Sequence, residues 1–320
     1  MSPLRQPWLP ELLVSAAKAS GIGYLAAVYA ISRWLTRPTR GKPQQTPADF
    51  GIRWEPLACA SADGFRLRGW VLTPPNPRAT VELFHGVYNT RAQTLTRSVL
   101  LARAGYRCVA FDFRAHGEST GRRTSFGYHE GRDVAAVDEL VRRCWPGQPR
   151  AALGISMGAA AVCFAARQTP AFDAVVLESL YRDIQSAFTN RLRSSYPPWF
   201  RRLGPGIVWM TERRIRVRMA DVAPVEWIGH LAPAPVLLLT GTADPHAPPA
   251  EAEELLQRCR GPRELWLVPG AGHRDVFETA GNAYAERVLD FLERSLFRRR
   301  HLPAIPAPLV IPSPTPGISA

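Results

Sequence analysis

The sequence predicts an α/β fold: a doubly wound, mostly parallel sheet with helices on both faces. Short apolar segments alternate with helical stretches along most of the chain, which is the pattern of a sheet covered on both sides. A Gly-x-Ser-x-Gly pentapeptide at residues 154–158 lies between one such strand and the helix that follows it. At 320 residues, the chain can form one domain of about 250 residues with extensions.

The composition is ordinary in apolar content, 46%, but the formal net charge of +13 is not. Arginine supplies nearly all of it, with concentrations at residues 33–42, 191–218 and 298–300. A basic balance indicates nucleic acid, an anionic membrane surface or acidic substrates as partners. Because no nucleic-acid module can be recognised, we expect no nucleic acid and favour a membrane surface. A general arginine bias of the source genome is the alternative explanation.

The cysteines are five in number and scattered along the chain: Cys59, Cys108, Cys144, Cys163 and Cys259. No Cys-x-x-Cys pair or Cys/His metal spacing occurs, so we expect free thiols in a reducing compartment and no metal.

Residues 12–35 are mainly apolar, interrupted by Lys18 and, near the end, by Arg33. As one helix they would extend roughly 36 Å, enough to cross a bilayer. Basic residues at 33–42 lie at the C-terminal end of this stretch, and a positive flank stays cytoplasmic. We therefore expect a cytoplasmic catalytic domain with a membrane anchor, spanning or interfacial. The alternative is a helix packed on the folded domain.

The elements follow in order after a helix-and-linker region, residues 1–50. Strands at 54–60 and 65–72 are joined across Asp63-Gly64, which indicates a hairpin. Further strands are predicted at 80–84, 107–111, 150–155, 174–178, 236–240 and 263–268. Helices are predicted at 91–104, 129–144, 159–167, 249–260 and 275–296.

Two segments depart from this alternation. Residues 180–231 are rich in Arg, Trp and Pro and contain no predicted strand, so they form an insertion within the folded domain, 51–298. Residues 299–320 form a Pro-rich tail that we expect to be disordered.

Ser156 is the candidate nucleophile, with Gly154 and Gly158 as supporting residues. A Gly-x-Ser-x-Gly between strand and helix forms a strained turn that projects the serine hydroxyl above the sheet. The flanking glycines let the strand and the helix pass closely.

A serine hydroxyl needs a base within hydrogen-bond reach and a third group that orients the base. Asp244 follows the strand at 236–240, and His273 follows the strand at 263–268. Parallel strands open on one edge of the sheet, so we expect both side chains to lie near Ser156. The order Ser, acid, His is the one that this turn predicts. Glu178 is the alternative acid.

His116 and His246 are the alternative bases. The first precedes the nucleophile in the chain, and we expect it to be structural. The second lies close to Asp244 and is the weaker alternative.

The oxyanion of a tetrahedral intermediate needs two N–H groups aimed at it. We expect the N–H of Met157, at the start of a helix, and that of Val87. Gly86 would allow close approach, and His85 would brace the loop.

With these residues in view, residues 55–296 resemble the α/β-hydrolase superfamily, in its serine aminopeptidase-like or dienelactone-hydrolase-like branch. The matching stretches are His85-Gly86, the segments 111–119 and 127–133, Gly154-Ile155-Ser156-Met157-Gly158, the segment 240–244 and Gly270-Ala271-Gly272-His273. The resemblance implies an eight-stranded sheet, a Ser156, His273, Asp244 triad and a lid at residues 180–231. It implies no cofactor.

The expected function is a serine hydrolase that cleaves a carboxylic ester or thioester through an acyl-Ser156 intermediate. Where aromatic residues of the lid face Ser156, they favour a small-molecule or lipid-like acyl substrate, and packing within the helices of the lid is the alternative role for them. An amidase or peptidase of the same fold is one alternative. A catalytically silent, membrane-tethered binding module is the other.

Overall fold

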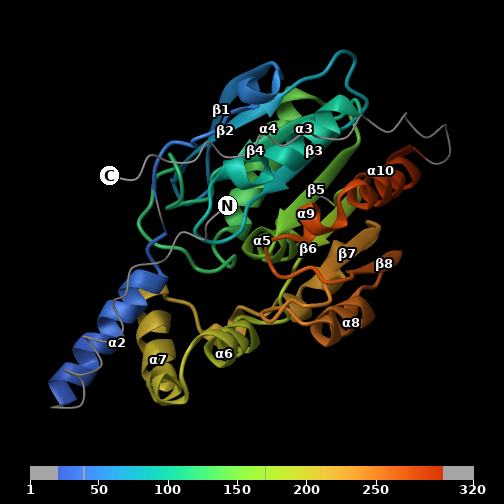
Figure 1. Cartoon of the computed structure of the whole chain (residues 1–320). Helices are drawn as coiled ribbons and strands as arrows, with labels where there is room; N and C mark the ends of the chain where they lie inside the picture. Colours follow the sequence, from blue (N-terminus) through green and yellow to red (C-terminus); the bar gives the residue numbers. More distant parts are fainter. Residues whose placement is uncertain (1–20, 39, 170, 298–320) are drawn as a thin grey trace, which may run out of the picture.

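The computed structural model describes residues 21–38, 40–169 and 171–297. At its centre lies an eight-stranded sheet in the order β1-β2-β4-β3-β5-β6-β7-β8 (Figure 1). The strands are β1 Trp54–Ala60, β2 Arg66–Leu72, β3 Thr80–Phe84, β4 Arg107–Phe111, β5 Arg150–Ile155, β6 Ala174–Glu178, β7 Val236–Gly241 and β8 Arg263–Val268. Strand β2 runs antiparallel to both neighbours and the other pairings are parallel, so the predicted fold class is confirmed.

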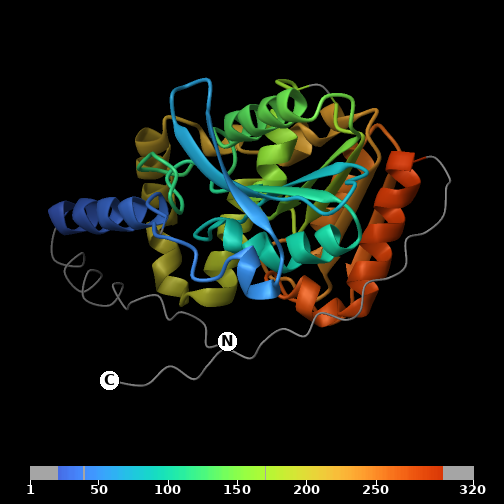
Figure 2. The ribbon, with the colours of Figure 1, turned by 90° about the horizontal axis from the view of Figure 1, so that it is seen from above.

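Helices cover both faces of the sheet. They are α3 Leu95–Arg103, α4 Gly131–Cys144, α5 Met157–Ala165, α8 Pro249–Arg258, α9 Val276–Ala280 and α10 Asn282–Phe297. Helices α4, α5 and α8 pack into one core, and α3, α9 and α10 pack into the other. Figure 2 shows α4 and α3 on opposite sides of the sheet.

Side chains of each central strand alternate between the two cores. In β6, Val175 and Leu177 enter one core while Ala174 and Val176 enter the other. This double burial explains why the parallel strands read as continuous apolar runs in the sequence.

The last predicted helix, 275–296, is divided in the structure. Gly281 has φ 53° and ends α9, and α10 begins at the next residue. Glycine takes this left-handed conformation without the Cβ clash of other residues. The helix predicted at 91–104 starts as a 3-10 turn, Arg91–Thr94.

Residues 180–231 contain helices and turns. They form α6 Ile184–Ser195, α7 Gly204–Ile215 and the 3-10 turns Pro198–Leu203, Met219–Asp221, Pro224–Glu226 and Ile228–Leu231. Helices α6 and α7 lie beyond the strand ends on the side where α5 begins (Figure 1).

The N-terminal helix α2, Gly21–Leu35, packs against α7. Val28 is fully buried in a small core with Ile207 of α7, and the Thr211 hydroxyl donates to Ser32 Oγ at 3.1 Å. Leu25 and Tyr29 are exposed on the same helix, 52% and 46% respectively.

A membrane anchor, spanning or interfacial, was predicted for residues 12–35, of which 12–20 lie outside the described residues. Within the described ranges, no helix combines the length and apolarity needed to cross a bilayer. The buried face of α2 fits the alternative of a helix packed on the domain. The predicted tail, 299–320, also lies outside the described residues.

Candidate active site

Ser156 lies on the turn between β5 and α5, with φ 51° and ψ −109°. A non-glycine residue rarely adopts a positive φ, and the turn is held by its surroundings. The Ser156 N–H donates to the Glu178 carbonyl at 2.8 Å. A Cβ on Gly158 would lie 2.2 Å from the Phe84 carbonyl oxygen, and one on Gly154 would lie 2.5 Å from the Ala159 nitrogen. Both positions therefore require glycine.

Ser156, His273 and Asp244 form one chain of hydrogen bonds. The Ser156 hydroxyl lies 2.9 Å from His273 Nε2, and His273 Nδ1 lies 2.7 Å from Asp244 Oδ2. Asp244 is only 3% exposed, and its other oxygen accepts from the N–H groups of His246 and Ala247 at 2.8 and 2.9 Å. A carboxylate fixed at both oxygens holds the imidazole with Nδ1 protonated, leaving Nε2 as the proton acceptor.

Glu178, the alternative acid, is engaged elsewhere. Its carboxylate accepts from Arg97 Nε at 2.9 Å and from the Tyr284 hydroxyl at 2.9 Å. The side chain is 1% exposed and bonds to α3 and α10 rather than to His273. Glu178 therefore forms a buried ion pair with Arg97 in the core.

Among the described residues, the Ser156 hydroxyl bonds to His273 and to neither alternative base. His116 is fully buried, its Nδ1 lies 2.9 Å from the Arg114 carbonyl, and its ring contacts His85 edge-on. The His246 ring meets that of His273 at 5.2 Å, so it lies beside the base. Burial, then electrostatic interactions with His273 and Arg191, lower the pKa of His246 to about 4.

The loop after β3 is braced by His85. Phe113 N–H donates to His85 Nε2 at 3.1 Å, so Nδ1 carries the proton and donates to the Gly86 carbonyl at 2.7 Å. Burial lowers the pKa of His85 to about 4, which keeps the ring neutral. In a trans peptide the carbonyl and the N–H point in opposite directions. The bond to Gly86 therefore orients the N–H of Val87.

Both candidate oxyanion donors, Val87 and Met157, line the same cavity as Ser156. Met157 is the first residue of α5, where the N–H groups point out of the helix and carry its positive dipole end.

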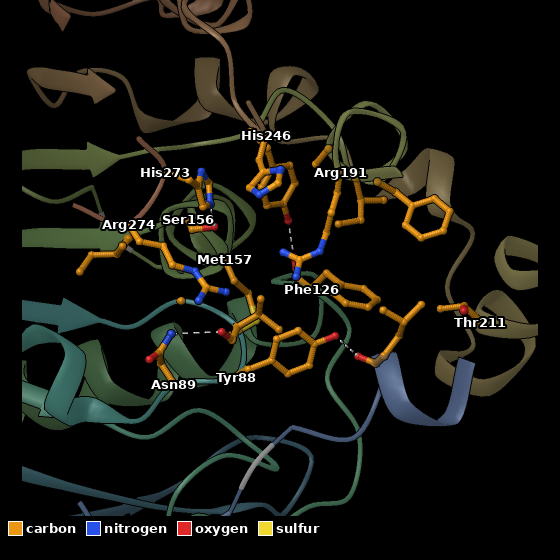
Figure 3. Close-up of a pocket in the computed structure, with 18 of the residues that line it drawn as sticks. Tyr88, Asn89, Phe126, Ser156, Met157, Arg191, Thr211, His246, His273 and Arg274 are labelled. Atoms are coloured by element: carbon orange, nitrogen blue, oxygen red, sulfur yellow. Dashed lines mark hydrogen bonds between the residues drawn. The ribbon is translucent and has the colours of Figure 1, made fainter. Parts of the chain in front are cut away.

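The cavity beside Ser156 has a volume of about 130 Å³. Its walls are mainly apolar side chains from α2, α6, α7 and the loops after β3 and β6. Figure 3 shows Ser156, His273, Tyr88 and Arg191 around it. Its lining includes Trp34, Leu35, Tyr88, Phe126, Tyr181, Ile184, Phe188, Ile207, Val208 and Met219.

Sequence reasoning missed part of this lining. Trp34 and Leu35 come from α2, which was predicted as a membrane anchor or a packed helix but not as a pocket wall. Tyr88, at φ 60°, stacks near Trp34 and donates to the Leu35 carbonyl at 2.7 Å. Arg274 also lines the pocket, and its position directly after His273 was the available signal.

Comparisons with known proteins agree with this architecture. Residues 75–230 match the family described as "Serine aminopeptidase, S33", and residues 214–300 match the family described as "TAP-like protein". The uncharacterized protein YqkD of Bacillus subtilis is 27% identical over 240 residues, which cover 73% of this chain and 77% of the relative. YfhR of Escherichia coli K12 is 24% identical over 252 residues, covering 76% of this chain and 81% of the relative.

Among solved structures, an esterase of Pyrococcus furiosus superposes with a TM-score of 0.70 at 23% identity, covering 82% of this chain and 98% of that one. The esterase domain of a Rhodothermus marinus protein superposes with a TM-score of 0.54 at 18% identity, covering 76% and 100%. Sheet order, the strained serine turn and these matches define one class. The chain belongs to the α/β-hydrolase superfamily and is a hydrolase.

Proposed function

We propose that this protein is a serine hydrolase that cleaves a carboxylic ester or thioester through an acyl-Ser156 intermediate. The observation that carries the proposal is the hydrogen-bonded chain from Ser156 through His273 to Asp244, which opens on a mainly apolar pocket. The esterase neighbours support the ester class by analogy of fold.

The mechanism follows from these contacts. His273 Nε2 accepts the proton of the Ser156 hydroxyl as Oγ attacks the carbonyl carbon. Asp244 stabilises the imidazolium that forms. The N–H groups of Val87 and Met157 donate to the oxyanion, a contribution of roughly 3–4 kcal/mol each. His273 then protonates the leaving oxygen or sulfur, and water releases the acyl group by the same steps.

Two alternatives use the same site. The matched family's description as a serine aminopeptidase favours an amidase or peptidase. A catalytically silent binding module would need none of the three reactive groups to be held in hydrogen-bond contact, so this alternative has less support.

A fluorophosphonate probe tests the proposal, because it reacts only with an activated serine. The wild type is expected to label, and Ser156→Ala is expected not to. Equal labelling of both proteins would show that another residue is the nucleophile.

Substrate class is tested separately with p-nitrophenyl esters of graded acyl length and their p-nitroanilide analogues. We expect turnover of the esters to exceed that of the anilides. A preference for the anilides would establish the amidase alternative.

A further inference from the structure

The pocket beside Ser156 is charged in an unusual way. Two guanidinium groups, those of Arg191 and Arg274, line it, whereas no described lining residue is an aspartate or glutamate. Among the residues that the structure describes, no ion pair joins either arginine to a carboxylate. The two side chains therefore bring positive charge into an otherwise mainly apolar cavity.

Both arginines are positioned by elements that already form the site. On α6, Ile184, Ala187, Phe188 and Arg191 all line the pocket. They are spaced three and four apart, so one face of the helix is turned to the cavity and Arg191 continues its apolar stripe. Arg274 follows the candidate base directly in sequence. Figure 3 shows both guanidinium groups directed into the pocket.

The positive charge of the two arginines lowers the pKa of neighbouring groups. Partial burial lowers the pKa of Arg274, and the charge of Arg191 lowers it further. Arg191 and Arg274 also disfavour protonation of His246, in addition to burial and His273. The Asp244 carboxylate has the opposite effect and raises the pKa of His246. This carboxylate is already bound to His273 and to two backbone N–H groups. The part-buried Arg191 and the exposed Arg274 thus bring positive charge to the pocket, and no carboxylate in its described lining balances it.

We propose that Arg191 and Arg274 bind an anionic group, a carboxylate or a phosphate, carried by the ester or thioester whose carbonyl lies at Ser156. The guanidinium group presents a planar fork of N–H donors that matches such oxyanions in two-point contact. The apolar walls contact the hydrocarbon part between the reacting carbonyl and the anion. The substrate class is therefore an ester or thioester with an apolar chain and a negative charge. This inference depends on the proposed serine-hydrolase function.

The test compares p-nitrophenyl esters of equal length whose acyl chain ends in a methyl, a carboxylate or a phosphonate group. The wild type is expected to give a higher kcat/KM for at least one anionic ester than for the neutral one. In Arg191→Gln this anionic-to-neutral ratio falls about 10- to 100-fold, the effect of losing a charged hydrogen bond. The better of the two anionic esters identifies the oxyanion. Arg193→Gln, an exposed arginine on the same helix, is the matched control and keeps the wild-type ratio.

A binding measurement separates this inference from the proposed function. Ser156→Ala is titrated calorimetrically with monomethyl suberate, which has a methyl ester at one end of its chain and a carboxylate at the other. Its affinity is expected to weaken in high salt. It is also expected to weaken when Arg191→Gln is added to Ser156→Ala. If the wild type hydrolyses no ester but this binding pattern holds, the serine-hydrolase proposal fails and the anion site stands. If the wild type prefers the neutral ester and the ratio is the same in Arg191→Gln, the anion site is refuted.

Discussion

His273 and His246 differ in what their rings contact, although they lie side by side. His273 bonds to both Ser156 and Asp244, whereas His246 contacts the His273 ring and keeps a low pKa of about 4. A ring with that pKa is neutral at pH 7 but is a weak base, so proton transfer from Ser156 is better served by His273.

We therefore expect His273→Ala to lose ester turnover by about 10⁴-fold or more, as removal of a triad base does. His246→Ala is expected to change kcat by less than about tenfold, because the Ser156 hydroxyl bonds to His273 and not to the His246 ring. Both are measured as kcat with a neutral p-nitrophenyl ester. Equal losses in two folded variants would contradict the assignment of the base.

His85 is expected to act on the reacting atoms indirectly, because its ring bonds to the Gly86 carbonyl and so orients the Val87 N–H. His85→Ala removes the donor that holds this peptide, so kcat is expected to fall about 10- to 100-fold with little change in KM, since the oxyanion exists only in the transition state. His116→Ala is the control: the His116 ring is as deeply buried but bonds to Arg114. It is expected to lower the melting temperature and to leave kcat within a few fold. An unchanged kcat in His85→Ala would exclude the positioning role.

At the scale of elements, β3 contains a buried carboxyl group with no partner. Glu82 is fully buried in the central sheet, and neither side-chain oxygen bonds to any described residue. Burial raises the pKa of Glu82 from 4.5 to about 8. The folded protein thus holds a proton that the unfolded chain releases between these two values.

The sign of the pH effect follows from this difference in bound protons. The contribution of neutral Glu82 to the free energy of unfolding is fully present below pH 4.5 and is lost as the pH rises toward about 8. In Glu82→Gln, which cannot ionise, this loss is absent. The free energies of unfolding of the two proteins should diverge by up to about 1.4 kcal/mol per pH unit in this interval, measured by urea denaturation. Parallel curves would show that the carboxyl group does not titrate there.

Helix α2 is held to α7 by a narrow buried face. Val28→Asp places an unpaired charge in that contact, so we expect α2 to detach and trypsin to cleave faster after Arg33 and Arg40, neither of which precedes a proline. Leu25→Asp lies on the same helix but at an exposed position, and it should leave the cleavage rate unchanged. Equal acceleration by both substitutions would mean that the α2 contact is not what protects this segment.

For the whole molecule, attachment to a membrane stays a prediction. The net charge is +13, and α2 exposes Leu25 and Tyr29 beside its buried face. An interfacial contact of this kind depends on charge, so a membrane-bound fraction should be released by high salt or alkaline carbonate. Retention after both treatments would indicate a spanning helix that includes residues before 21.

Much of the architecture could be predicted because its signals are local. Ser156, Asp244 and His273 each follow an apolar strand, and parallel strands bring such positions to one edge of the sheet. The pocket walls could not be predicted in this way. Trp34 and Leu35 reach Tyr88 through a contact between segments more than fifty residues apart, and no periodic pattern encodes that distance. The break at Gly281 was missed because a single glycine inside an apolar periodic stretch does not reveal its φ.

The bond from the Tyr88 hydroxyl to the Leu35 carbonyl joins the end of α2 to the wall of the pocket beside Ser156. A recombinant form trimmed before residue 40 would keep all three candidate catalytic groups but lose Trp34 and Leu35 from the wall of the pocket where we propose that the acyl chain binds. Its preferred chain length would then differ from that of the intact protein, so substrate screens should be run on the full-length chain.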